Sequence, residues 1–212
     1  MKALEDYACK HFGMTVEQMM QNAGKAIFDF VQTLDDTSRI LVVIGKGNNG
    51  GDALVAARLL HEAGKEVTVI NPYAGIEFTK AAAAELDKAM EARLKILHDY
   101  RSANFSEFDL IIDGLFGFSL KGDPKPPANA IIEQINCSNV PVLAVDVPSG
   151  LDVSTGTLGN PTVRATHTLA LGIPKFGFQE HPDVVGQLHY GNLGIPREAY
   201  EAKGYKYPEF IH

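Results

Sequence analysis

Three polar segments each follow an apolar run and carry carboxylates. They occupy residues 45–52, 113–123 and 146–152. A charge placed directly after a buried strand is costly unless it faces a cleft or has a partner. In an open parallel sheet, ligands collect outside the carboxyl ends of the strands. Three such ends together favour one ligand site over three unrelated helix caps.

The first segment contains Gly-Lys-Gly-Asn-Asn-Gly at 45–50, which matches the dinucleotide fingerprint between a predicted strand and a predicted helix. Its glycines let backbone N–H groups approach a ligand. The alternative is a tight strand-to-helix turn, in which glycine and asparagine occur only because they tolerate positive φ. A dehydrogenase would need an acidic residue after the next strand, where Asn71 stands. Asp52 is expected in the first helical turn, able to bind ribose hydroxyls or position a water.

The other two segments supply further polar groups. Lys121 lies between glycines, and its ammonium group could bind a phosphate; the alternative is a solvated surface lysine. Ser149 lies in Val-Pro-Ser-Gly-Leu, which is not a nucleophile elbow, so it is a ligand or a turn residue. Oxygens of Asn49, Asp113 and Ser149 could together surround a hard cation. Lys175 follows a later strand and either points toward the same crevice or lies in a plain loop.

Alternating apolar patterns predict the elements that position these segments. Helical periodicity predicts helices at 16–34 (capped by Thr15), 51–62, 79–95 and from Pro127 to 135, while short apolar runs predict strands at 39–44, 66–70, 108–113, 140–146, 166–171 and an edge strand within 186–193. Strands that alternate with helices predict a mainly parallel sheet with helices on both faces. We expect one α/β domain over residues 1–212, with an extra N-terminal helix before its first strand.

Composition narrows the class of protein. The formal net charge of −7 and the pI near 5.5 give no general electrostatic reason to bind nucleic acid or an anionic membrane. Cys9 and Cys137 lie far apart, as expected for reduced cysteines, and the seven histidines show no metal-binding spacing. No run approaches the ~20 apolar residues of a membrane span. The expectation is a cytoplasmic protein.

In order and spacing, the three segments resemble NAD(P)H-hydrate epimerases. The resemblance rests on Gly-Asn-Asn-Gly-Gly-Asp at 47–52, Asp-Gly-Leu-Phe-Gly at 113–117 and Asp-Val-Pro-Ser-Gly-Leu-Asp at 146–152. It implies a three-layer α/β/α Rossmann-like fold, often dimeric, that interconverts the R and S forms of NADHX and NADPHX. A dehydratase on a separate chain would complete the repair. Ala53 and Thr166 depart from residues common in the family.

The resemblance also implies the roles of individual residues. A potassium ion is expected near Asn49, Asp113 and Ser149. Substrate contacts are expected at Asn48, Asn49, Gly50, Gly51, Asp52, Gly117, Phe118, Ser119, Leu120, Lys121, Gly122, Asp123 and Asp146. We assign acid–base catalysis to Asp113 and Lys121, with Asp146 as a binding or water-positioning group. The alternatives are a non-catalytic dimerising module of the same fold and an NAD(P)-dependent oxidoreductase.

Overall fold

The computed structural model describes residues 1–210, and its centre is a seven-stranded sheet in the order β3-β2-β1-β4-β5-β8-β9. All of its strand pairs are parallel. The strands are β1 (Arg39–Ile44), β2 (Glu66–Ile70), β3 (Lys95–Leu97), β4 (Leu110–Gly114), β5 (Val142–Val145), β8 (His167–Leu171) and β9 (Gln187–Gly191). The predicted parallel sheet and its edge strand are confirmed.

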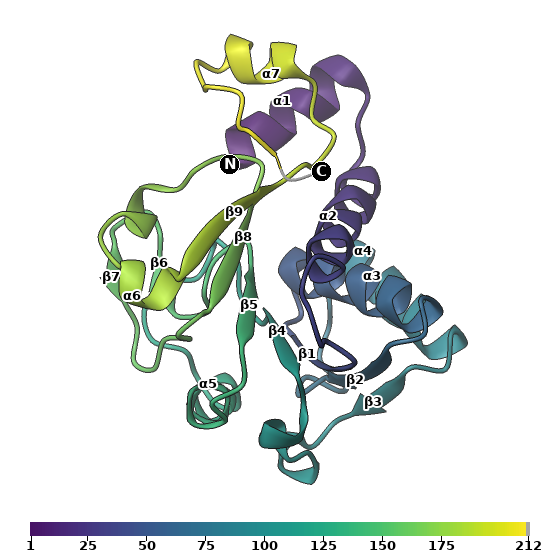
Figure 1. Ribbon diagram of the computed structural model, residues 1–212. Coiled ribbons are helices and arrows are strands. Elements are labelled where there is room, and N and C mark those ends of the chain that lie inside the picture. The colour runs from purple at the N-terminus through teal and green to yellow at the C-terminus, as the bar shows by residue number, and fades with distance from the viewer. Residues whose placement is uncertain (211–212) are drawn as a thin grey trace.

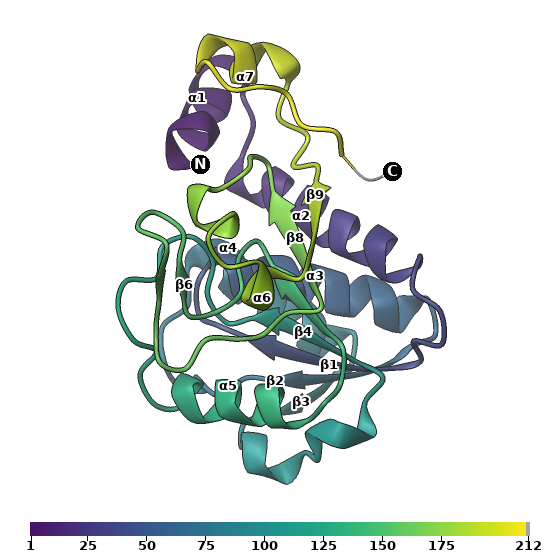
Figure 2. The same cartoon turned by 60° about the vertical axis from the view of Figure 1, so that its left-hand side comes forward.

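Helices cover both faces of this sheet, which confirms the three-layer architecture (Figures 1 and 2). One face carries α2 (Val16–Val31), α3 (Asn48–Glu62) and α4 (Lys80–Glu91), and the other carries α5 (Ala128–Cys137). The remaining elements are a small hairpin of β6 (Leu151–Asp152) and β7 (Thr157–Leu158), helices α6 (Pro182–Val185) and α7 (Arg197–Ala202), and short 3-10 turns η1 (Tyr100–Ser102), η2 (Phe105–Glu107) and η3 (Phe176–Phe178).

Strand β1 shows why the sheet is buried on both sides. Ile40, Val42 and Ile44 pack into the core under α2 and α3, whereas Leu41 and Val43 pack into the core on the α5 side. Successive side chains of a strand point to opposite faces, so a strand covered on both faces must be apolar throughout.

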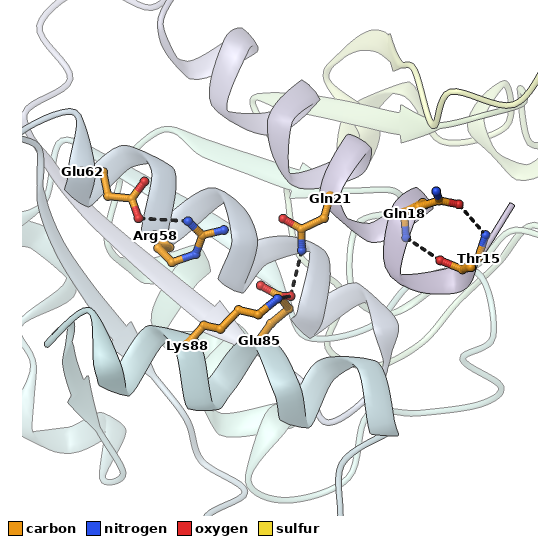
Figure 3. A network of polar contacts seen from close by, with 7 residues as sticks. All are labelled: Thr15, Gln18, Gln21, Arg58, Glu62, Glu85 and Lys88. Atoms are coloured by element: carbon orange, nitrogen blue, oxygen red, sulfur yellow. Dashed lines mark hydrogen bonds and ion pairs between the residues drawn. The ribbon is translucent and has the colours of Figure 1, made fainter.

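Two helices precede the sheet, where the sequence predicted one. The unpredicted helix is α1 (Lys2–Phe12), which ends at Gly13 with φ 65° and packs beside α7 (Figures 1 and 2). The predicted cap of α2 is confirmed: Thr15 Oγ1 accepts from the Gln18 N–H at 3.1 Å, and Gln18 Oε1 accepts from the Thr15 N–H at 2.9 Å (Figure 3). This reciprocal capping box fixes where α2 begins.

Several predicted helix boundaries were wrong. Helix α2 ends at Val31 rather than at residue 34, and α5 continues to Cys137 rather than ending at residue 135. Helix α4 ends at Glu91 rather than residue 95, because Arg93 adopts a left-handed φ of 59° and the chain then forms the short strand β3. Helix α3 begins at Asn48, three residues before the predicted start. Within the described residues, no helix is both long and apolar enough to cross a membrane.

Candidate active site

A cavity of about 420 Å³ lies at the carboxyl ends of β1, β4, β5 and β8. Side chains of α1 and α2 close its other side. Its lining combines apolar groups with polar and acidic ones: Met1, Glu5, Val16, Met19, Met20, Lys46, Gly47, Asn48, Asn49, Asp52, Thr79, Leu115, Phe116, Gly117, Phe118, Ser119, Asp146, Leu171 and Leu193. The strand ends that the sequence singled out therefore meet at one hollow.

The glycines of the first segment serve close packing. None of residues 45–52 has a positive φ, so the interpretation of a turn that merely tolerates positive φ was wrong. A Cβ on Gly45 would lie 1.8 Å from the Leu115 carbonyl oxygen, and one on Gly50 would lie 2.0 Å from the Gly45 carbonyl oxygen. Because those neighbours are backbone atoms, only glycine lets β1, α3 and the segment after β4 come together.

Asp52 lies in the second turn of α3, because the helix begins at Asn48. Its expected place in the first turn was therefore wrong, and the favourable interaction with the helix dipole is weaker there. The side chain is partly buried and lines the cavity. Burial raises the pKa of Asp52 well above its usual value, and the nearby carboxylates of Asp146 and Glu5 raise it further. A raised pKa favours the protonated form of a carboxyl group, which is the form that can donate a proton.

Asp146 directly follows β5 in a left-handed conformation, with φ 65°. Its Oδ1 accepts a hydrogen bond from the Leu171 N–H at 3.1 Å and forms an ion pair with the Lys175 ammonium. The Lys175 Nζ also donates to the Leu171 carbonyl oxygen at 3.0 Å. The other oxygen, Oδ2, lies beside Gly117, where an added Cβ would be 3.3 Å away. The carboxylate is thus anchored through one oxygen.

Asp113 is fully buried within β4 and does not line the cavity. Its Oδ2 accepts from the Ser149 N–H at 2.8 Å, and its Oδ1 accepts from the Ser149 hydroxyl at 2.7 Å and from the Leu115 N–H at 3.2 Å. Burial raises the pKa of Asp113 to about 6, although these hydrogen bonds act against the rise. The Phe116 N–H donates to Ser149 Oγ at 2.9 Å. Asp113 and Ser149 therefore tie the ends of β4 and β5 together.

The structure brings only part of the predicted contact set to the cavity. The cavity wall includes Asn48, Asn49, Asp52, Gly117, Phe118, Ser119 and Asp146. The wall does not include Gly50 and Gly51, which are buried in α3, or Leu120, Lys121, Gly122 and Asp123. Lys121 is exposed, and Asp123 accepts a hydrogen bond from the Asn160 N–H at 2.9 Å.

Sequence reasoning missed three polar groups of the wall: Glu5, Lys46 and Thr79. Glu5 comes from α1, an element that was not predicted, and nothing in the local sequence places that helix beside the cavity. Lys46 lies within the glycine segment, so its position next to Gly47 could have identified it as a wall residue. Thr79 Oγ1 donates to Asn48 Oδ1 at 2.8 Å, a contact between residues distant in sequence. Asn71 is buried, and its Oδ1 accepts from the Tyr73 N–H at 3.0 Å, so it shapes a turn.

The oxygens of Asn49, Asp113 and Ser149 are chemically suited to a hard cation. The Nδ2 of Asn49 is buried without a hydrogen-bond partner, and turning the amide about its terminal bond would direct an oxygen there instead. The Asp113 carboxylate accepts three hydrogen bonds and keeps a free lone pair. Between residues 1 and 210, no group of three or more His, Cys, Asp or Glu side chains is arranged to hold a metal.

Comparison with known proteins places this site in a family. The family model for the YjeF-related protein N-terminus matches residues 16–177. The NAD(P)H-hydrate epimerase of Plasmodium vivax (strain Salvador I) is 37% identical, with 93% of this chain and 68% of the relative covered. A bifunctional NAD(P)H-hydrate repair enzyme of Escherichia coli (strain K12) is 34% identical, with 90% of this chain and 38% of the relative covered.

Among solved structures, the crystal structure of the yeast protein ynu0 (YNL200c) superimposes with a TM-score of 0.77 at 25% sequence identity. The match covers 94% of this chain and 88% of the yeast chain. Together, the family model, the relatives and this structure show that the chain belongs to the family of YjeF-related protein N-termini, which the three strand-end motifs predicted.

Proposed function

We propose that this protein is an isomerase that interconverts the R and S forms of hydrated NADH and NADPH. The observation that carries the proposal is that Asp52 of α3 and Asp146, which follows β5, line one largely apolar cavity. The relative from Plasmodium vivax, whose match covers 93% of this chain, is named NAD(P)H-hydrate epimerase. The family and the site thus support the same reaction.

The reaction needs acid–base chemistry. The stereocentre of the hydrate carries a ring nitrogen and a hydroxyl group. An acid protonates the hydroxyl, the C–O bond breaks with its electron pair on oxygen, and water leaves while the nitrogen lone pair forms a planar iminium. Water then attacks the opposite face, the C=N electrons return to nitrogen, and a base takes the extra proton from the water. Carboxylates also stabilise the transient cation.

The geometry favours Asp52 and Asp146 for these proton transfers, because both line the cavity. The raised pKa of Asp52 suits the acid that protonates the leaving hydroxyl. Asp146, anchored on one oxygen, can accept the proton of the attacking water on the other. The assignment of catalysis to Asp113 and Lys121 stays a prediction, and neither side chain lies on the cavity wall.

The start of α3 suits the phosphates of the substrate. No side chain caps its first residues, so their N–H groups are free to bind an anion. Lys46 and Asn48 lie on the wall at the same place and add a cation and an amide. Gly117, Phe118 and Ser119 line the other side of the cavity. We therefore place the dinucleotide between the segment after β1 and the segment after β4.

We further propose that Asn49, Asp113 and Ser149 hold a potassium ion. When bound, the ion would supply positive charge next to the buried Asp113 and hold the two strand ends in one arrangement. The unpartnered Asn49 amide and the chemistry of the three oxygen donors support this. A homodimer and a dehydratase on a separate chain also remain proposals, which the family resemblance supports. A cytoplasmic location remains a proposal as well.

Chromatography tests the proposed function. Purified protein is mixed with S-NADHX, and R-NADHX is followed against a sample without protein, because the hydrate equilibrates slowly unaided. We expect fast interconversion that Asp52→Asn reduces and Asp87→Asn, an exposed carboxylate on α4, leaves unchanged. Absence of accelerated interconversion contradicts the proposal. Hydride transfer with intact NAD(P)H would favour the oxidoreductase alternative instead.

A further inference from the structure

Lys175 is the one lysine in the described part of the chain whose side chain is buried, with 6% of its surface exposed. Burying an ammonium group is costly unless acceptors replace its water. Lys175 finds two acceptors, the Asp146 carboxylate and the Leu171 carbonyl oxygen at 3.0 Å. It does not line the cavity. Its charge is therefore directed at Asp146, a carboxylate that does line the cavity.

The ion pair leaves the two oxygens of Asp146 with different tasks. Oδ1 is held by the Leu171 N–H and by Lys175. Within residues 1–210, no donor forms a hydrogen bond with Oδ2, which lies beside Gly117 on the cavity side. A carboxylate held in this way presents one unoccupied oxygen in a fixed direction. Proton transfer depends on such positioning.

The arrangement is poorly explained as a device for stability. A buried ion pair seldom stabilises a fold more than apolar side chains of similar volume would. Asp146 also adopts a left-handed backbone, with φ 65°, which costs energy for a residue with a Cβ. Strained residues of this kind cluster at functional sites. Asp52 and Glu5 share the cavity with Asp146, so a nearby cation also offsets the repulsion among three carboxylates.

We propose that Lys175 is a positioning residue of the epimerase reaction, which fixes the Asp146 carboxylate so that its free oxygen faces the reacting carbon of the substrate. This inference rests on the proposed function. Lys175 itself touches no substrate and acts through Asp146. Its removal should therefore impair the chemical step while the walls that bind the dinucleotide stay in place.

The test measures kcat and KM for S-NADHX in Lys175→Met, Asp146→Asn and the double variant. We expect Lys175→Met to lower kcat about 100-fold with little change in KM, the loss that a small misplacement of a catalytic group produces. Because Lys175 acts through Asp146, the double variant should be no slower than Asp146→Asn alone. Lys175→Arg, which keeps the charge, should retain more activity than Lys175→Met. Lys88→Met, which removes a half-exposed partner of Glu85, serves as the control and should keep the normal kcat.

The outcomes separate the two proposals. If the unchanged protein does not interconvert the epimers, the proposed function fails and the role of Lys175 fails with it. If the unchanged protein is active and folded Lys175→Met has a normal kcat, only the role of Lys175 is overturned. Independent, multiplying losses in the double variant also overturn it. If Lys175→Met does not fold, the double variant still provides the test, because it leaves neither charge buried without its partner. A kcat of the double variant well below that of Asp146→Asn would then overturn the role of Lys175.

Discussion

The carboxyl ends of β4 and β5 look alike in sequence and differ in the structure. Each has an aspartate directly after an apolar run, yet Asp113 lies inside β4 and Asp146 lies one residue beyond β5. Asp113 accepts three hydrogen bonds from protein groups around it, whereas Asp146 keeps one oxygen beside the cavity. A carboxylate at a strand end is therefore positioned for chemistry only where the turn leaves one of its oxygens free.

The strongest test of this comparison replaces each aspartate by asparagine. We expect Asp146→Asn to lower kcat about 10³-fold, because a proton acceptor is lost. Asp113→Asn should lower the free energy of unfolding, and kcat for the folded fraction should fall much less. Kinetics with S-NADHX and urea unfolding measure both effects. A larger loss of kcat in folded Asp113→Asn would reverse the comparison and restore Asp113 as the catalytic group.

Ser149→Ala tests the structural role of the β4 end. The change removes the hydroxyl that donates to Asp113 Oδ1 and accepts from the Phe116 N–H. Asp113 Oδ1 then keeps only the hydrogen bond from the Leu115 N–H, and the Phe116 N–H loses the Ser149 hydroxyl as its acceptor. We expect the free energy of unfolding to fall by about 3 kcal/mol, as for other buried groups that lose their partners. Ser154→Ala, at an exposed position, is the matched control in urea unfolding. Equal stability of the two variants would refute this role.

Potassium binding provides a second test of the end of β4. If the ion binds at Asn49, Asp113 and Ser149, a concentration 100 times its Kd should add about 2.7 kcal/mol to the free energy of unfolding. Thermal unfolding in potassium chloride and in tetramethylammonium chloride at equal ionic strength measures this difference. Ser149→Ala should be much less sensitive to the choice of salt. Identical melting temperatures in both salts for the unchanged protein would contradict the proposal that potassium binds at the end of β4.

The smallest expected effect concerns Asp52 and pH. Burial, together with Asp146 and Glu5, raises the pKa of Asp52 in the folded state, so folding favours its protonated form. Asp52 therefore contributes to stability at low pH. This contribution is lost as the pH rises from the pKa of Asp52 in the unfolded state to its pKa in the folded state. Asp52→Asn should melt at a higher temperature than the unchanged protein at pH 8, and the difference should vanish near pH 3. A lower melting temperature of the variant at pH 8 contradicts this.

The sequence predicted the parallel sheet and the meeting of its strand ends, because continuous apolar runs such as residues 39–44 leave few other folds. It did not reveal that Asp113 points inward. Strand β4 continues to Gly114, and Asp113 pairs with Val43 and Ala144 on both sides. That register depends on neighbouring strands, not on local composition. The contribution of Glu5 was equally hidden, since the packing of α1 beside α7, near the carboxyl ends of the strands, is a tertiary contact.

The close backbone packing of Gly45 and Gly50 bears on how this enzyme can be redesigned. The two glycines lie behind the part of the cavity wall that residues 46–49 form, and a side chain on either glycine would clash with backbone atoms. The opposite side includes Met19 and Met20 of α2, whose unbranched side chains repack readily. Libraries that seek activity on bulkier nucleotides should therefore vary the methionines of α2 and leave the glycines untouched.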